Sequence, residues 1–269
     1  MSLDSAYAHC EAQARAAARD RWLGSLFAPS ALRRHLHALI AFEIEMGRLR
    51  LALRDPRAGE IRLVWWREAL SGERAGEAQA SPVAAAMLDT LATFRPPPHL
   101  IENAVTGRQA DLFDDLFPTV ADLEGYLGET RSGLLQIAAL VLGEGRDLGA
   151  AETSGLAGVA LGLIELLRGG PQPLAFAPAD VLARHGVSAD EWRDGGASPG
   201  PAAVRAELIA LARRRLGEAE LARAKLPKAL APAYASLATA SLALSALASG
   251  REIAVWRRQW ALWRWMRRA

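Results

Sequence analysis

The stretch RWLGSLFAPSALRRHLHALIAFEIEMGRLRLALRDPRAGEIRLVWWREAL, residues 21–70, carries the clearest structural signal in this chain. Its apolar side chains recur three or four residues apart, which is the spacing of one face of an α-helix. The first such set consists of Leu32, Leu36, Leu39, Ile40, Phe42 and Met46. Pro29 and the Asp55-Pro56 step interrupt the pattern, because proline cannot continue a helix. The stretch therefore predicts helices between these breaks.

The same periodicity continues along the chain, for example in residues 123–127 and 134–138, and alternating strand patterns are absent. Ala, Leu and Arg dominate, whereas aromatic residues make up only 6%. Further breaks at clustered Pro and Gly suggest roughly eight to ten helices. With 269 residues, 51% of them hydrophobic, we expect a single all-α domain spanning residues 1–269. Cys10 is the single cysteine, so no internal disulfide is expected.

The net charge is +2, but residues 251–269 alone carry six Arg and one Glu, so the remainder is acidic. A basic tail on an acidic body, with no nucleic-acid-binding motif, argues against nucleic acid as a partner. The first 22 residues are charged throughout and lack an apolar leader segment. We therefore expect a cytoplasmic protein, with a peripheral position at the inner membrane face as a further expectation.

The uncharged run from Ala229 to Gly250 is long enough to raise the question of a transmembrane helix. Pro232, Thr239 and four serines make the run only weakly hydrophobic. A helix buried in a soluble bundle is the interpretation we favour.

Four stretches in the same order resemble the squalene/phytoene synthase family: residues 21–70, 107–135, 156–168 and 178–192. The resemblance implies an isoprenoid synthase-type helical bundle around a central cavity. Catalytic members of the family join two prenyl diphosphates head to head. That chemistry needs Mg²⁺, held by aspartates on two facing helices, to neutralise the diphosphate leaving group.

The aspartates that the resemblance requires are missing from this chain. The first cluster falls on Gly47, Arg48 and Leu51, none of which can ligate a metal. The second follows a step that here reads Glu165-Leu166-Leu167-Arg168, and Gly169-Gly170-Pro171 stand where acids are needed. We expect no metal site and no cofactor, with Mg²⁺ only if other acids substitute.

Other acidic and metal-binding residue types offer weak substitutes. Glu43 and Glu45 are two residues apart, so they point about 200° away from each other on a helix and cannot chelate together. Asp111 to Asp115 matches a DxxxD spacing, but the family shows only one acid there, matching Asp111, and Asp114 and Asp115 suggest a solvated face. His35 and His37 likewise diverge around a helix and are expected to be exposed.

The candidate cavity-lining residues are those that fall on helices matched to the family. Among them Trp66 lies one turn after Arg62, so the guanidinium of Arg62 could stack on its ring. Trp65 must face elsewhere. A packing role is favoured for both tryptophans. Glu45 is expected to pair with Arg48 or with neighbours across the bundle. The set is Phe42, Glu45, Arg48, Arg62, Trp66, Asp111, Tyr126 and Arg168.

The last residues, VWRRQWALWRWMRRA, predict a basic amphipathic helix rich in tryptophan. At about 100° per residue, Trp256, Trp260 and Trp263 fall within about 60° of one another, with Leu262 and Met266 extending that sector. Such a helix suits an anionic membrane surface. The expected membrane contacts are Trp256, Arg257, Arg258, Trp260, Trp263 and Arg264. The alternative is that the tryptophans dock onto the bundle and the arginines are merely solvated.

Three functions follow from the sequence. The missing aspartates and the Trp65-Trp66-Arg67 string resemble the branch of the family that has lost its metal ligands, which includes a respiratory complex I assembly factor. This favours a pseudoenzyme that acts as a binding or assembly protein, with respiratory complex subunits as partners. One alternative is a divergent prenyl-diphosphate transferase; another is a protein that binds an isoprenoid or quinone-like ligand without turnover.

Overall fold

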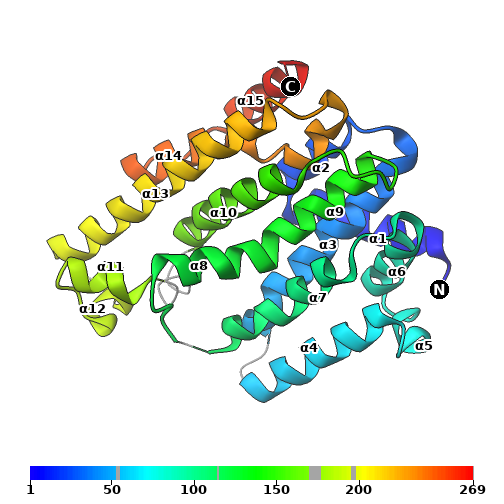
Figure 1. Ribbon diagram of the computed structural model, residues 1–269, viewed down its shortest axis with the longest axis horizontal. Coiled ribbons are helices and arrows are strands. Elements are labelled where there is room, and N and C mark those ends of the chain that lie inside the picture. The colour runs from blue at the N-terminus through cyan, green and yellow to red at the C-terminus, as the bar shows by residue number, and fades with distance from the viewer. Residues whose placement is uncertain (53–54, 114, 170–176, 195–197, 269) are drawn as a thin grey trace.

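The computed structural model describes residues 1–52, 55–113, 115–169, 177–194 and 198–268, without the side chains of residues 50–52. Every regular element in these ranges is helical, and they contain no strand (Figure 1). The predicted all-α class is confirmed. The fifteen α-helices of the described residues exceed the predicted number, because several of them are only one or two turns long.

The N-terminal part of the chain surrounds one long helix, α3. Helices α1, α2, α4, α6 and α9 all contact α3, and the segment η1 contacts both α3 and α4. Proline occupies the first turn of α4, α6 and α7, where its missing N–H costs nothing. The bounds are α1 Leu3–Ala17, α2 Arg19–Ser25, α3 Ser30–Ala52, α4 Pro56–Ser71, α5 Ala75–Ala78, α6 Pro82–Phe94 and α7 Pro98–Thr106.

The middle of the chain forms the layer that faces α3. Helices α8 and α9 run as one rod, joined without a break by η2, a single turn of π-helix. Helix α10 packs along this rod and against α13. The bounds are η1 Gly107–Leu112, α8 Val120–Leu127, η2 Gly128–Ser132, α9 Gly133–Leu142 and α10 Ala151–Arg168.

The C-terminal part covers the other side of α10, with α13, α14 and α15 along one edge of the molecule (Figure 1). The bounds are α11 Ala179–Arg184, α12 Ala189–Arg193, α13 Pro199–Arg223, η4 Lys228–Tyr234, α14 Leu237–Ser249 and α15 Val255–Arg268. By length and composition residues 228–249 could cross a membrane, but half of the stretch is buried in the bundle. It packs against α9, α10 and α13, as the sequence interpretation favoured.

The predicted exposure of His35 and His37 is wrong, because each is only 3% exposed. His35 Nδ1 lies 2.9 Å from both the Tyr7 hydroxyl and the Thr90 hydroxyl. His37 Nε2 lies 2.8 Å from the Ser25 hydroxyl. The two rings do diverge around α3, but helices cover α3 on several sides, so both directions lead into protein.

Candidate functional site

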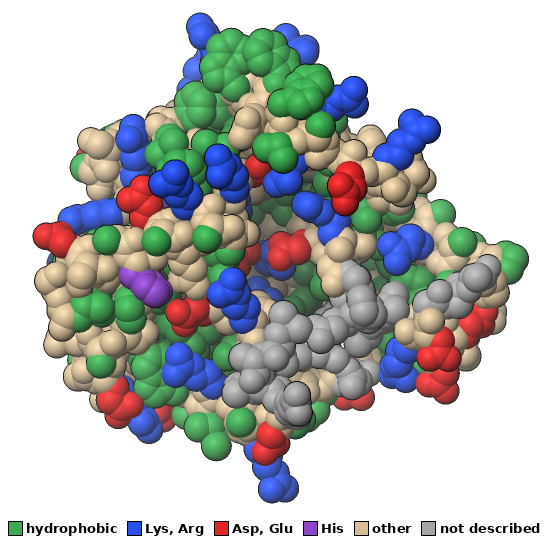
Figure 2. All heavy atoms as spheres, turned by 180° about the vertical axis from the view of Figure 1, so that it is seen from behind, with side chains coloured by type: hydrophobic (Ala, Val, Ile, Leu, Met, Phe, Trp, Pro, Cys, Tyr) green, Lys and Arg blue, Asp and Glu red, His purple; other side chains and the backbone are tan. Residues whose placement is uncertain are grey.

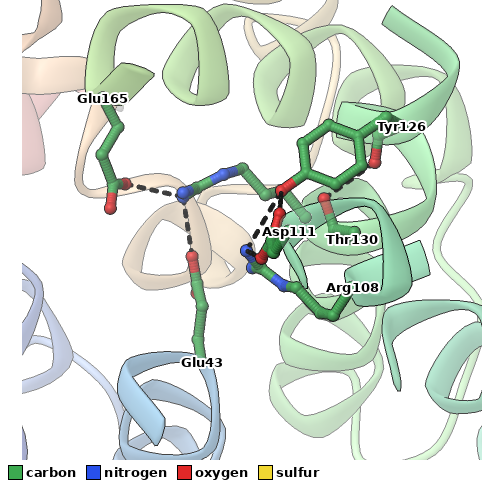
Figure 3. Close-up of polar contacts among 7 residues, drawn as sticks. Glu43, Arg108, Asp111, Tyr126, Thr130 and Glu165 are labelled. Atoms are coloured by element: carbon green, nitrogen blue, oxygen red, sulfur yellow. Dashed lines mark hydrogen bonds and ion pairs between the residues drawn. The ribbon is translucent and has the colours of Figure 1, made fainter. Parts of the chain in front are cut away.

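An arginine lies between two carboxylates, one from the nearly buried Glu43 and one from Glu165, whose side chain is 66% exposed (Figure 3). Arg131, on the π-helical turn η2, donates from Nη1 to Glu43 of α3 at 2.9 Å and to Glu165 of α10 at 2.6 Å. Glu43 also forms an ion pair with Arg21 of α2, whose Nη2 lies 2.6 Å from Glu43 Oε2. Three segments that are distant in sequence are thereby joined through one guanidinium group.

The backbone around η2 explains how Arg131 reaches this position. A π-turn inserts an extra residue into a helix and rotates the following side chains, a device common at functional sites. Helix α10 approaches η2 closely because Gly158 and Gly162 carry no side chain. A Cβ at Gly162 would lie 2.9 Å from Arg131 Cδ, and one at Gly158 would lie 2.2 Å from Ser132 Oγ. The small residues of α10 thus fix the depth at which Arg131 sits.

A second buried cluster lies beside the first (Figure 3). Arg108 Nη1 donates to Asp111 at 3.2 Å and lies 3.4 Å from the Tyr126 hydroxyl, which itself donates to Asp111. Thr130 donates to the backbone carbonyl of Tyr126 at 2.7 Å. Burial raises the pKa of the Tyr126 phenol, so this group stays protonated as a donor. The structure therefore joins two predicted site residues, Asp111 and Tyr126, through an arginine that was not predicted.

The charges at the centre compensate one another. Arg131 lowers the pKa of Glu165 to about 2, so this carboxylate is ionised at neutral pH. Burial opposes the charge of Arg131, but Glu165 and Glu43 more than offset it and raise the pKa of the guanidinium. The guanidinium of Arg131 is always charged and only donates hydrogen bonds. The space between the carboxylates of Glu43 and Glu165 is therefore occupied by a cation that belongs to the protein itself.

This donor set does not fit Mg²⁺. The metal ion needs several oxygen ligands in octahedral array, whereas Glu43 and Glu165 bind the guanidinium. Gly47 and exposed Arg48 lie one turn further along α3 from Glu43. Gly169 follows Glu165 by one turn; Leu51's side chain, Gly170 and Pro171 lie outside the described residues. Across the part of the chain that is described, no three His, Cys, Asp or Glu side chains gather as a metal site requires.

Two aromatic candidates, Phe42 and Trp66, pack against each other in the core. Neither has exposed surface, and their rings meet edge to face at 5.3 Å. The Arg62 guanidinium lies 4.3 Å from the ring centroid of Trp65 and farther, 5.7 Å, from that of Trp66. The stacking expected on Trp66 therefore falls mainly on Trp65. Trp66 is thus a packing anchor.

The remaining candidates lie away from the Arg131 centre or at its edge. Burial raises the pKa of half-buried Glu45, whereas Arg62, His9 and, least of these, Arg48 lower it. Arg48 and Arg168 are exposed. Asp115 is exposed too, as predicted, whereas Asp114 lies outside the described residues.

Beside the Arg131 centre lies an apolar pocket that encloses about 380 Å³ of space, part of it open to solvent. Its walls come from α2, α3, α9 and η4, and Arg21 and two serines are its polar members. The enclosed interior itself holds only about 30 Å³, room for a water molecule or two, whereas pockets for small molecules enclose about 300–1,000 Å³. The lining residues are Arg21, Ser25, Leu36, Leu39, Ile40, Leu134, Leu135, Ala138, Pro232, Ala233, Ala235 and Ser236.

Four charged residues of the central site, Glu43, Arg108, Arg131 and Glu165, were not predicted as site residues. Arg108 and Arg131 lie within the stretch 107–135 that matched the family, but nothing local marks them. Glu43 was considered only as a chelating partner for Glu45. The signal that remained unused was the concentration of glycines at 125, 128 and 133, which bracket the π-turn.

The fold and this centre can now be compared with known proteins. The family model "Squalene/phytoene synthase" matches residues 14–264. The chain therefore belongs to the squalene/phytoene synthase family.

Curated relatives and solved structures add detail. The chain is 27% identical over 177 residues to "NADH dehydrogenase (ubiquinone) complex I, assembly factor 6" of Rattus norvegicus, covering 64% of this chain and 53% of that protein. Its Drosophila melanogaster homolog is 29% identical over 190 residues, covering 67% and 56%. The chain thus matches about half the length of these relatives.

Solved structures share the fold. Squalene synthase HpnC from Alicyclobacillus acidocaldarius superimposes with a TM-score of 0.73 at 21% identity, over 92% of this chain and 95% of that one. A dehydrosqualene synthase in complex with ligand gives 0.78 at 18% identity, over 99% and 97%. At these identities the likeness concerns the fold alone.

Proposed function

We propose that this protein is a non-catalytic member of its family that assists the assembly of respiratory complex I. The curated relatives that it matches are named as complex I assembly factors. The observation that carries the loss of catalysis is the Arg131 guanidinium between Glu43 and Glu165.

The physical reason lies in the leaving group. Diphosphate departs from a prenyl chain only when its negative charge is neutralised, which metal ions do by bridging carboxylates and phosphate oxygens. Here the two carboxylates that face each other across the bundle are occupied by an arginine of the same chain. Displacing this arginine would remove one of the two arginine partners of the nearly buried Glu43, which is unfavourable. The rival function, a divergent prenyl-diphosphate transferase, would need a metal site that the described residues do not form.

The apolar pocket supports a second, compatible role as a ligand-binding protein. Leucine, isoleucine, alanine and proline side chains form most of its wall, and Arg21 provides a positive charge. The apolar wall and the positive charge match an isoprenoid or quinone-like ligand with an apolar chain and a polar end, and the pocket must widen beyond its interior of about 30 Å³ to take one. Decylubiquinone or geranylgeraniol should raise the melting temperature of the wild-type protein but not that of Ala138→Phe, which fills the pocket. An equal shift in both proteins would contradict this role.

The assembly role is tested in the organism that carries this chain. We place the protein in the cytoplasm, and we propose respiratory complex subunits and no nucleic acid as its partners. Deleting its coding sequence should reduce assembled complex I on native gels, and wild-type protein should restore it. Subassemblies of the complex should copurify with the tagged protein. Unchanged complex I in the deletion strain would contradict the proposal.

A further inference from the structure

The C-terminal helix α15 is held to the bundle by one face only. Leu262, which is 3% exposed, packs on Ala235 and Ala238. Arg258 donates two hydrogen bonds to Asp20 of α2, at 2.9 and 2.7 Å.

Half-buried Trp265 lies on the same side of α15, and the guanidinium of Arg223 lies 5.5 Å from its ring. These contacts fix the rotation of α15 about its axis. The side that carries the other tryptophans is thereby turned away from the bundle.

That other side presents a stripe of large aromatic rings. Trp256, Trp260 and Trp263 are 64%, 56% and 42% exposed, which makes them the largest exposed apolar side chains of the described surface. Trp260 and Trp263 stack with their centroids 5.0 Å apart. Figure 2 shows large hydrophobic side chains projecting where α15 lies, with basic side chains around them. Three exposed indoles in one row are far more than isolated surface residues require.

The charges beside this stripe are all of one sign. Arg257, Arg264, Arg267 and Arg268 are exposed, and no acidic residue occurs between positions 255 and 268. The guanidinium of Arg267 lies 4.9 Å from the Trp263 ring centroid, and that of Arg257 lies 5.5 Å from that of Trp256. A partner of this face must therefore be negatively charged and must accept indole rings at its boundary.

We propose that this face of α15 rests in the plane of an anionic phospholipid surface and attaches the helical bundle to it. Indole rings are favoured at the level of lipid headgroups, and arginines gain from anionic lipids. The helix is too short and too charged to span a bilayer. Because Leu262, Trp265 and Arg258 remain bound to the bundle, the attachment needs no rearrangement of α15. The proposal goes beyond the assembly role and does not depend on it.

The test is sedimentation of the full-length protein with vesicles of phosphatidylcholine alone or with one quarter phosphatidylglycerol. The wild type should bind the anionic vesicles at low salt, release at high salt and ignore the neutral vesicles. The triple change Arg257→Gln, Arg264→Gln and Arg268→Gln should weaken binding at least about tenfold. Its matched control replaces three exposed arginines elsewhere, Arg67, Arg213 and Arg214, by Gln and should bind as the wild type does.

The aromatic contribution is tested separately. Changing Trp256, Trp260 and Trp263 to Ser should also abolish most binding, while circular dichroism shows an intact bundle, because all three side chains are exposed. The control changes the exposed Ile61, Val64 and Leu221 to Ser. Wild-type protein that ignores anionic vesicles would overturn the proposal. So would a wild type that binds polyglutamate as tightly, since that result identifies an acidic protein surface as the occupant.

Discussion

Arg131 donates a hydrogen bond to Glu43, which lies 88 residues earlier in the chain, over a distance of 2.9 Å. The same nitrogen reaches Glu165, 34 residues later. Both Arg131 and Glu43 are nearly buried, with side chains 12% and 13% exposed. A fixed cation thus joins α3 to η2 and α10.

Arg131→Met should lower the free energy of unfolding by about 1.5–3 kcal/mol, because the nearly buried Glu43 loses one of its two arginine partners and keeps Arg21. Urea denaturation followed by circular dichroism measures this loss.

Arg184→Met provides the matched control. Arg184 also bridges two carboxylates, Asp180 and Glu207, but its side chain is 48% exposed, so the loss should stay below about 1 kcal/mol. If Arg131→Met and Arg184→Met lower the free energy of unfolding equally, the ion pairs of Arg131 with Glu43 and Glu165 stabilise the protein no more than exposed ion pairs do.

Gly158→Ala should destabilise the protein by about 1–3 kcal/mol, because the added methyl group meets the backbone of Ser132 at 2.7 Å. Gly155→Ala, one turn earlier on α10, meets no atom within 4 Å and should instead stabilise the helix by about 0.5–1 kcal/mol. Thermal unfolding distinguishes the two variants. A shift of the same sign in both would show that α10 and η2 are not in close contact.

His35 should make stability depend on pH. Burial, and then Arg34, lower the pKa of His35 to about 4, whereas an unfolded chain titrates near 6.5. Between these values only the unfolded state binds the proton, so stability falls as the pH drops from about 6.5 to 4, by up to about 3 kcal/mol. His35→Gln should flatten this part of the curve, although it lowers stability overall.

The exposed His99 serves as the reference for that measurement. His99→Gln should keep the wild-type slope between pH 6.5 and 4. If His35→Gln keeps the same slope as well, the folded protein protonates His35 at an ordinary pH and the buried network with Tyr7 and Thr90 is not as described.

The helices were the part of the structure that the sequence predicted best. Pro56, Pro82 and Pro98 begin helices because a fixed φ and a missing N–H suit the first turn. Short helices such as α5, with four residues, escaped because periodicity needs at least two turns to appear. The exposure of His35 and His37 was predicted wrongly for a related reason. Helical spacing gives the direction in which each side chain points from the helix, but it does not show on how many sides other helices cover that helix.

The central site was predicted only in part. The family resemblance brought out Asp111 and Tyr126, which the structure joins. Arg131 could not be predicted, because its partners are distant in sequence and its direction depends on a π-turn that periodicity does not reveal.

For α15, projecting the sequence onto a helix at about 100° per residue predicted a stripe of Trp256, Trp260 and Trp263, and these three side chains are exposed. The same projection wrongly assigned Leu262 to the stripe, because it assumed a single apolar face. Docking onto the bundle requires a second apolar face, and Leu262 and Trp265 provide it.

The most direct test of the central claim is release of diphosphate by the purified protein. Farnesyl or geranylgeranyl diphosphate is supplied with Mg²⁺, an active squalene synthase serves as the positive control, and released diphosphate is measured over hours. Because Arg131 holds the facing carboxylates, the account predicts no release above the protein-free background. Sustained turnover that depends on Mg²⁺ would contradict it.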